Sequence, residues 1–181
     1  SSGIVFLPYL LGERAPESLP DASATFFGIN RGTTQKEISR AVFESCAYVG
    51  FSLAEMIESS GYEINSVTVS GGLARFDLIN QIKADVSNKR VVVVENFEST
   101  ALGAFILLAV SIGLFEYTQN VIKDVVKIRK VIYPSEKNHA IYKDYYFLFK
   151  EINQSLFNLY PIHKKILSKY KIEESEMVKN L

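Results

Sequence analysis

SVTVSGGLARF, residues 66–76, and VVVVENFESTALGAF, residues 91–105, are the two stretches that decide the fold. Each contains β-branched residues, which favour strands, and then passes through glycine or polar residues into a helical pattern. The unbroken run Val91–Val94 predicts a strand that is buried on both faces, as in a parallel sheet covered by helices. The order strand, helix, strand, helix therefore predicts an α/β fold with a right-handed crossover.

Gly71 and Gly72 follow the first of these strands, and the next helix is expected from about Arg75 to Val86. Glycine lets backbone N–H groups approach a ligand, and a helix N-terminus carries partial positive charge. Residues 96–98 follow the second strand, and parallel strands place their carboxyl ends at one edge. One cleft for an anionic or nucleotide ligand is the prediction, and a tight turn without a ligand is the alternative.

Capping and periodicity predict three further features of the helices. Thr34 and Glu37 form a capping-box pattern before a long helix that Gly61 ends, with Cys46 on its apolar face. Ser99 or Thr100 is expected to cap the third helix, which Gly113 ends. The second helix should bury the stripe Phe76, Leu78, Ile79, Ile82 and Val86.

The two ends of the chain carry less specific patterns. Residues 4–10 indicate a short buried segment, residues 24–29 an edge strand or turn, and Glu13-Arg14 a solvated loop or a pair of partners across a cleft. Residues 118–128 are expected to be helical, and residues 130–138 to be a connector. An aromatic helix should run from Asn138 to Tyr160 and stop at Pro161, with packing as the role of its rings. The remaining residues to Leu181 should form a frayed tail.

Composition excludes several classes of protein. A net charge of zero over 181 residues gives no attraction for nucleic acid or an acidic membrane surface. A single cysteine excludes an intrachain disulfide framework, and no apolar run is long enough to span a bilayer. No P-loop, paired-cysteine metal motif, GxSxG elbow or catalytic carboxylate pair is visible, and His139 and His163 are expected at the surface. Because the first residue is serine, the chain is expected to be part of a longer protein.

Four segments resemble the FGGY carbohydrate kinases, sugar and polyol kinases of the actin/hexokinase superfamily. FLPYLLGERAP, residues 6–16, is similar to a segment of the xylulokinase and gluconokinase branches. Residues 24–44 fit the second sequence signature of the family, and VSGG, residues 69–72, resembles its adenosine motif. ESTALGA, residues 98–104, is similar to the segment that follows this motif.

The resemblance implies an α/β, ribonuclease-H-like (actin/hexokinase-type ATPase) C-terminal domain, with helices packed on a mixed sheet and the N-terminal lobe absent. Residues 1–160 would be part of this ATP-binding domain and residues 161–181 its tail. Carried over by position, the residues against the adenosine would be Gly71, Gly72, Leu73, Ala74 and Phe76. The family usually has Ser or Asn where this chain has Phe76, so adenine binding is expected to differ, with stacking as one possibility.

The implied activity is that of an ATP-dependent carbohydrate kinase that requires Mg²⁺. Residues 95–104 are similar to a gluconate kinase string, so gluconate is the expected substrate, and xylulose or the substrate of another FGGY kinase is the alternative. The family's general base, an Asp, and most sugar contacts lie in the N-terminal half, so no catalytic or metal-binding residue is expected here. The chain alone should therefore be inactive. The whole protein should be cytoplasmic, with a homodimer as the candidate assembly and without nucleic-acid or membrane partners.

Two alternatives belong to other functional classes. A non-catalytic nucleotide-binding pseudokinase module would explain Phe76 as a motif defect. A dimerisation domain would use the aromatic helix as its partner surface.

Overall fold

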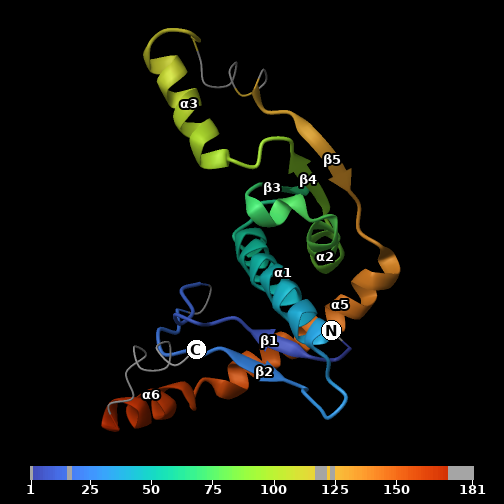
Figure 1. The fold of residues 1–181 in the computed structure, drawn as a ribbon, viewed down its shortest axis with the longest axis vertical. Helices are drawn as coiled ribbons and strands as arrows, with labels where there is room; N and C mark the ends of the chain where they lie inside the picture. The colour runs from blue at the N-terminus through green and yellow to red at the C-terminus, as the bar shows by residue number, and fades with distance from the viewer. Residues whose placement is uncertain (1, 16–17, 117–121, 123–124, 171–181) are drawn as a thin grey trace. The chain divides into compact units, whose positions relative to one another are not determined.

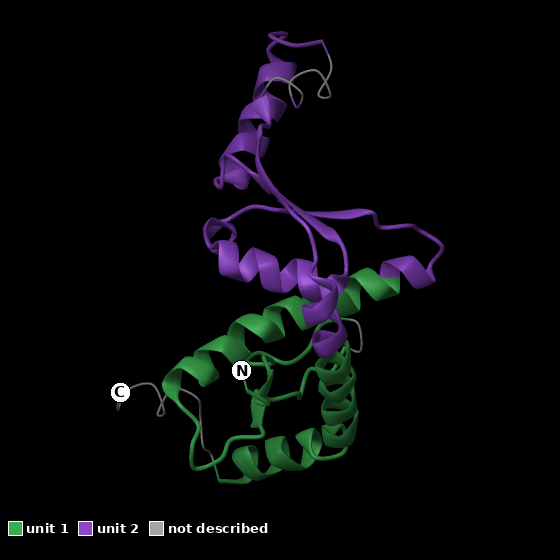
Figure 2. Ribbon diagram, turned by 90° about the vertical axis from the view of Figure 1, so that its right-hand side faces the viewer, with its two compact units in different colours: residues 1–56, 143–181 green, residues 57–142 purple. Residues whose placement is uncertain are grey.

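The computed structural model describes residues 2–15, 18–116, 122 and 125–170 (Figure 1). Contacts divide the chain into two compact units, which Figure 2 shows in green and purple. Unit 1 comprises residues 1–56 and 143–181, and unit 2 comprises residues 57–142. Each unit is described by itself below.

Unit 2 contains the three-stranded sheet, in the order β3-β4-β5 (Figure 1). β3 (Ser66–Val69) and β4 (Arg90–Val94) are parallel, with Val67 opposite Val91, so the predicted parallel pairing is confirmed. The predicted burial of the valine run is confirmed for Val91, Val93 and Val94. β5 (Ile128–Ile132) runs antiparallel to β4, which makes the sheet mixed.

The prediction of a connector at residues 130–138 is wrong at both ends, because β5 extends through Ile132 and the next helix begins at Glu136. Its sequence, IRKVI, mixes charged and apolar residues, which is typical of an exposed edge strand and a weak signal in a single sequence. The predicted helix 118–128 falls mostly on residues outside the described part of the chain, and Ile128 itself belongs to β5.

The helix after the glycines begins later than predicted. A 3-10 turn, η1 (Gly72–Arg75), comes first, and α2 (Asp77–Ser87) starts only after Phe76. Phe76 and Leu78 are 58% and 55% exposed, so their assignment to the buried stripe is wrong. The later start places them on the outer face, while Ile79, Ile82 and Val86 are buried as predicted.

α3 (Ser99–Ser111) has Glu98 at its N-cap, without a side-chain cap, so the prediction of Ser99 or Thr100 is wrong by one or two positions. Gly113 follows the helix with φ 77°, a conformation that favours glycine, as predicted. Within the described part of the chain, no helix combines the length and apolarity that a membrane crossing needs.

Unit 1 is built on a strand pair, β1 (Val5–Leu7) and β2 (Thr25–Phe27), which are antiparallel. All three residues of β1 are buried, as predicted for this segment, and the Phe6 and Phe26 rings stack at 4.1 Å. Ile4 and Phe6 pack with Ala41 of α1 (Gln35–Ser59) in one apolar cluster. The predicted edge strand and long helix are both confirmed.

The capping box at the start of α1 is formed. The Thr34 N–H and hydroxyl both donate to Oε2 of Glu37 at 2.8 Å, and the Glu37 N–H donates to the Thr34 hydroxyl at 3.4 Å. Gly61 follows the helix with φ 90°, as a C′ glycine does.

The prediction that Cys46 lies in the core is wrong, because its side chain is exposed. The buried face of α1 includes the polar residues Glu44 and Ser45, which an apolar pattern does not identify. Burial of Glu44 is compensated by Arg40, whose Nε donates to its carboxylate at 2.8 Å. Residues 41, 44, 45 and 48 lie on the buried face of the helix. At about 3.6 residues per turn, Cys46 lies on the opposite, exposed side.

α5 (Glu136–Leu156) and α6 (Tyr160–Lys169) replace the single predicted helix. Pro161 does not stop a helix but lies in the first turn of α6, where its missing N–H is not needed. Residues 171–181, the charged end of the predicted frayed tail, lie outside the described residues. The packing role of the aromatic helix is confirmed by ring contacts among Tyr48, Tyr146 and Phe149.

In each of two pairs that the sequence placed at the surface or in a solvated loop, one residue differs from expectation. Glu13 is only 5% exposed and its carboxylate accepts a hydrogen bond from Asn153 at 3.2 Å, so a solvated loop is wrong for this residue. His163 is exposed as predicted, whereas His139 is half-buried, with its Nδ1 2.9 Å from the carbonyl of Asp85.

Candidate functional site

The segments that follow β3 and β4 lie at one edge of the sheet, as parallel pairing requires. The Gly71 N–H donates to the carbonyl of Phe97 at 3.0 Å, so the two strand ends are joined directly. The Glu95 N–H donates to the carbonyl of Lys127 at 2.8 Å and holds the second segment near the start of β5. The prediction that the glycines and residues 96–98 meet at one edge is confirmed.

The two glycines have different roles in the backbone. Gly71 has φ 83° and ψ −179°, a conformation that only glycine adopts readily, so the turn itself requires it. Gly72 does not have a positive φ, and a Cβ at either glycine would meet nothing within 4 Å. The turn therefore leaves open space over both residues, and at Gly72 no backbone constraint explains the missing side chain.

The other residues expected against a nucleotide divide by exposure. Leu73 and Phe76 are 45% and 58% exposed beside the bare glycine backbone. Ala74 is only 1% exposed and packs in a core cluster with Val69 and Val93, so its side chain faces the interior of unit 2. Leu73 and Phe76 are thus the apolar side chains that a ligand at the glycines could contact.

Phe76 occupies the N-cap of α2 without capping it. Its φ of −99° and ψ of 110° are the extended values of an N-cap, and its carbonyl accepts the N–H groups of Ile79 and Asn80. Helices prefer Ser, Thr, Asp or Asn at this position, because their side chains satisfy a free N–H of the first turn. The ring of Phe76 cannot do so, and it remains exposed.

An open cleft of about 480 Å³ lies beside the joined strand ends. The guanidinium groups of Arg75 and Arg129 lie 5.4 and 5.6 Å from the centre of the Phe97 ring, within the range of cation–π attraction. Nη2 of Arg75 is also 3.6 Å from the carboxylate of Glu98, an exposed ion pair. The residues that line the cleft are Arg75, Glu95, Asn96, Phe97, Glu98, Val125 and Lys127.

Sequence reasoning placed residues 96–98 at this edge, and they line the cleft, whereas Gly71 and Gly72 do not line it. It missed the contacts of Arg75 and Arg129 with the Phe97 ring. Arg75 was assigned to the start of a helix, and Arg129 belongs to a strand that the sequence did not reveal. No pattern in one sequence links Arg75 to Phe97, because the contact depends on how two loops meet.

The described residues give this cleft groups that bind and none arranged for chemistry. Among them, no three His, Cys, Asp or Glu side chains gather where they could hold a metal ion. The cleft itself offers cationic groups beside the Phe97 ring, and the bare turn of Gly71 and Gly72 lies next to the cleft without lining it. Such a site can hold a planar, anionic or polar ligand.

The fold and this edge together define an α/β domain with an open cleft at the carboxyl ends of parallel strands, where ligands bind in open α/β sheets. The family model of the C-terminal domain of the FGGY family of carbohydrate kinases matches residues 1–112. The chain therefore belongs to the FGGY family of carbohydrate kinases, and the resemblance and the fold class predicted from the sequence are confirmed.

Individual relatives agree with this assignment. A xylulose kinase from Staphylococcus epidermidis is 31% identical over 152 residues, which are 84% of this chain and 31% of that protein. The crystal structure of a ligand-bound xylulose kinase from Lactobacillus acidophilus is 27% identical, with a TM-score of 0.79 over 90% of this chain and 33% of that one. A gluconate kinase structure from Lactobacillus acidophilus is 28% identical, with a TM-score of 0.77 over 88% and 32%. The chain thus spans about a third of the length of these relatives.

Proposed function

We propose that the protein to which this chain belongs is an ATP-dependent carbohydrate kinase, and that this chain supplies the surface for the adenosine. The observation that carries the proposal is the bare backbone of Gly71 and Gly72 at the joined strand ends of a domain of this family. Leu73 and Phe76 would contact the nucleotide from the exposed side of the turn. The exposed ring of Phe76 suits stacking on a base, where a small polar side chain would form hydrogen bonds.

The rest of the protein would supply the chemistry. Phosphoryl transfer depends on positioning of the phosphate, on charge stabilisation and on a base oriented toward the acceptor hydroxyl. In this proposal the carbohydrate and the general base lie outside these residues. Mg²⁺ would neutralise phosphate charge, and since the described residues offer no cluster for it, its protein ligands would also lie elsewhere. Because ATP is the phosphate donor, we place the protein in the cytoplasm.

Gluconate is the substrate that we propose, with xylulose as the alternative. Residues 95–104 are similar to a gluconate kinase string, while relatives of both kinds share the fold at similar identity. The test is a panel of sugars, including gluconate and xylulose, with the full-length protein and a coupled assay of ADP release. Turnover confined to another class of acceptor would overturn the choice of substrate. An absence of turnover with every acceptor would overturn the proposal that the protein is a kinase.

Substitution of the two glycines tests the nucleotide site separately from the activity. Gly72→Ala should leave the fold intact, because φ is not positive and the new Cβ meets no atom within 4 Å. If a nucleotide lies against Gly72, the added methyl group should weaken ATP binding by about tenfold, which corresponds to about 1.4 kcal/mol. Ser70→Ala, one position outside the pair, is the matched control. Equal ATP affinity of Gly72→Ala and the control would place the nucleotide elsewhere.

Phe76 also supports a second candidate, a non-catalytic nucleotide-binding module. Its ring replaces the polar residue that the family usually carries, so a nucleotide could bind in an orientation that does not support transfer. Tight ATP binding by the full-length protein, with no turnover on any acceptor of the panel, would favour this candidate over the kinase.

A further inference from the structure

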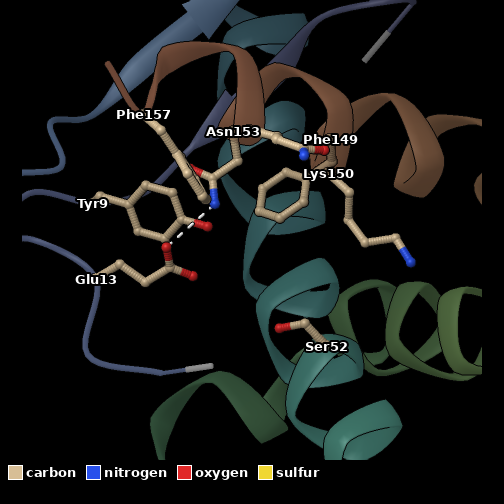
Figure 3. A pocket seen from close by; sticks show the side chains of 8 residues that line it. Tyr9, Glu13, Ser52, Phe149, Lys150, Asn153 and Phe157 are labelled. Atoms are coloured by element: carbon tan, nitrogen blue, oxygen red, sulfur yellow. Dashed lines mark hydrogen bonds between the residues drawn. The ribbon is translucent and has the colours of Figure 1, made fainter. Parts of the chain in front are cut away.

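The described part of the chain buries two asparagine side chains, one in each unit, and their amides differ in hydrogen bonding. Asn153 lies beside Glu13 at a pocket of about 250 Å³ in unit 1 (Figure 3). Its Nδ2 donates to Oε2 of Glu13 at 3.2 Å, and its Oδ1 accepts from the Tyr160 hydroxyl at 3.4 Å. Both ends of this amide therefore have partners.

Asn80, in α2 of unit 2, uses one end of its amide. It is 0% exposed, and its Nδ2 donates to the carbonyl of Ala74 at 2.8 Å. Its Oδ1 is buried without a hydrogen-bond partner among the described residues. A buried acceptor without a partner costs free energy, whereas a leucine of similar size would carry no such acceptor. Packing alone therefore does not favour asparagine at this position, and the contribution of the amide is its bond to Ala74.

The carbonyl that Asn80 binds belongs to the turn after the glycines. Within this turn, η1, the Ala74 N–H donates to the carbonyl of Gly71 at 3.1 Å. On the other side, the Gly71 N–H donates to the carbonyl of Phe97 at 3.0 Å. Hydrogen bonds thus connect the loop after β4 to Gly71, Gly71 to Ala74, and Ala74 to Asn80. The bare backbone of Gly71 and Gly72 is held from both ends.

The local backbone explains why a side chain supplies the donor for this carbonyl. η1 ends at Arg75, and Phe76 is extended before α2 begins at Asp77. An extended residue interrupts the helical ladder, and carbonyl groups at the end of a helical turn lack donors from the turn that follows. The backbone N–H of Asn80 donates to the carbonyl of Phe76 at 3.2 Å, while its side chain reaches Ala74. Asn80 therefore joins α2 to η1 across the interruption.

We propose that Asn80 is a positioning residue of the nucleotide site. Because it is fully buried, it does not contact the nucleotide, and it acts through η1 by holding the backbone of Gly71 and Gly72. A turn whose conformation is already set loses less entropy when its ligand binds. Without the amide, the apparent affinity for ATP would fall with the population of the competent conformation. The inference rests on the proposed function, which places the nucleotide at these glycines.

The test compares ATP binding by the full-length protein and by Asn80→Leu, which removes the donor and keeps a side chain of similar size. Isothermal titration calorimetry should show about tenfold weaker ATP binding by the variant. In the assay of ADP release, the KM for ATP should rise by a similar factor with little change in kcat, because bound ATP holds the turn at saturation.

Ser87→Ala is the matched control. Ser87 is a buried residue at the far end of the same helix, and its hydroxyl donates to the carbonyl of Lys83 at 2.7 Å, away from the glycine turn. Its substitution removes a buried hydrogen bond of α2 and should not change ATP affinity.

A purely structural role of Asn80 predicts a different result. Asn80→Leu would then change the melting temperature but bind ATP as tightly as Ser87→Ala does, and this outcome would overturn the inference. An absence of ATP binding by the unmodified protein would overturn the proposed function, and the positioning role with it. The two failures are therefore distinguishable.

If Asn80→Leu does not fold, amide NMR of the unmodified full-length protein provides a second test. ATP should shift the backbone signals of Gly71 and Gly72, which it contacts, and also the side-chain amide signals of Asn80, which it does not reach. Shifts at both glycines without a shift at Asn80 would show that the amide is not coupled to the site and would overturn the inference.

Discussion

Phe76 stands where α2 would be more stable with a different residue. It is the N-cap by its backbone conformation, yet it contributes no side-chain acceptor to the first turn. The exposed ring loses little contact on substitution, so its replacement should show mainly the effect of the cap. A ring that is exposed at a position where it costs helix stability is a stronger indication of a binding role than exposure alone.

We predict that Phe76→Asn stabilises α2 by about 1 kcal/mol, the usual contribution of an N-cap side chain. The measurement is hydrogen exchange at the amides of α2, together with the thermal unfolding of the chain. Phe76→Ala removes the ring without adding an acceptor and is the control. Equal protection of α2 in the two variants would show that the side chain at residue 76 does not reach the first turn.

Asp85 connects α2 to the start of α5 within unit 2. The carboxylate is 2% exposed and accepts from the side chain of Gln81, from the N–H of Ser135 and from the amide of Asn138, at 2.8 to 2.9 Å. The bond from Ser135 satisfies a backbone N–H just before the first residue of α5. No sequence pattern reveals this link, because the two partners are 50 residues apart.

We predict that Asp85→Ala destabilises unit 2 by about 1–3 kcal/mol, because partly buried donors lose their acceptor. Asp144→Asn, at an exposed position of α5, is the control and should have little effect. Urea unfolding followed by hydrogen exchange at residues 135–142 measures the difference. Similar unfolding curves for the two variants would mean that water replaces the lost carboxylate without cost.

The capping box of α1 should make the start of this helix sensitive to acid. Hydrogen bonds from the Thr34 backbone, then from the Ser2 and Thr34 side chains, lower the pKa of Glu37 from its ordinary value of 4.5. Because the folded pKa is the lower one, the charged form stabilises the helix above pH 4.5, and this contribution is lost as the pH falls through the folded pKa.

The expected observation is a fall in amide protection at residues 35–38 below pH 4.5, in step with the titration of the Glu37 carboxyl group. Glu37→Gln keeps an acceptor that does not titrate in this range and should remove the step. If the step persists in this variant, another group causes it.

The features that the sequence predicted well are those set by local patterns. The valine run, the capping box and the terminal glycines each act over a few residues, and β3, β4 and α1 follow them closely. The failures depend on contacts between distant segments. β5 is a strand only because β4 offers a partner, and Glu44 is buried because Arg40 compensates its charge. Phe76 was placed inside because the 3-10 turn that shifts α2 has no clear sequence signal.

The position of the candidate cleft was predicted from the same local patterns. These patterns place the two loops at one edge of the sheet but do not show which side chains are buried there. The glycine turn and the loop after β4 could be assigned to one edge, because parallel strands end together. The burial of Ala74 could not, since it depends on packing against Val69 and Val93. The pocket with Glu13 and Asn153 could not be predicted either, because these residues are 140 positions apart.

At the scale of the whole molecule, this chain carries one part of a proposed catalytic site. It spans 31% of a xylulose kinase from Staphylococcus epidermidis and 33% of the one from Lactobacillus acidophilus. Closure of two lobes around ATP and an acceptor would exclude water and bring a base to the acceptor hydroxyl. The described residues of this chain show a binding surface and no gathered catalytic groups.

We predict that the 181-residue chain alone binds ATP weakly and does not transfer phosphate to gluconate or xylulose. Binding uses the glycine turn and the exposed side chains beside it, which are present, whereas transfer needs a base and phosphate contacts that we place outside these residues. The measurement is ADP release by the purified chain, with the full-length protein as the positive control. Acceptor-dependent ADP release by the chain itself, in proportion to its concentration and reduced in Gly72→Ala, would show that the reacting groups lie within these residues.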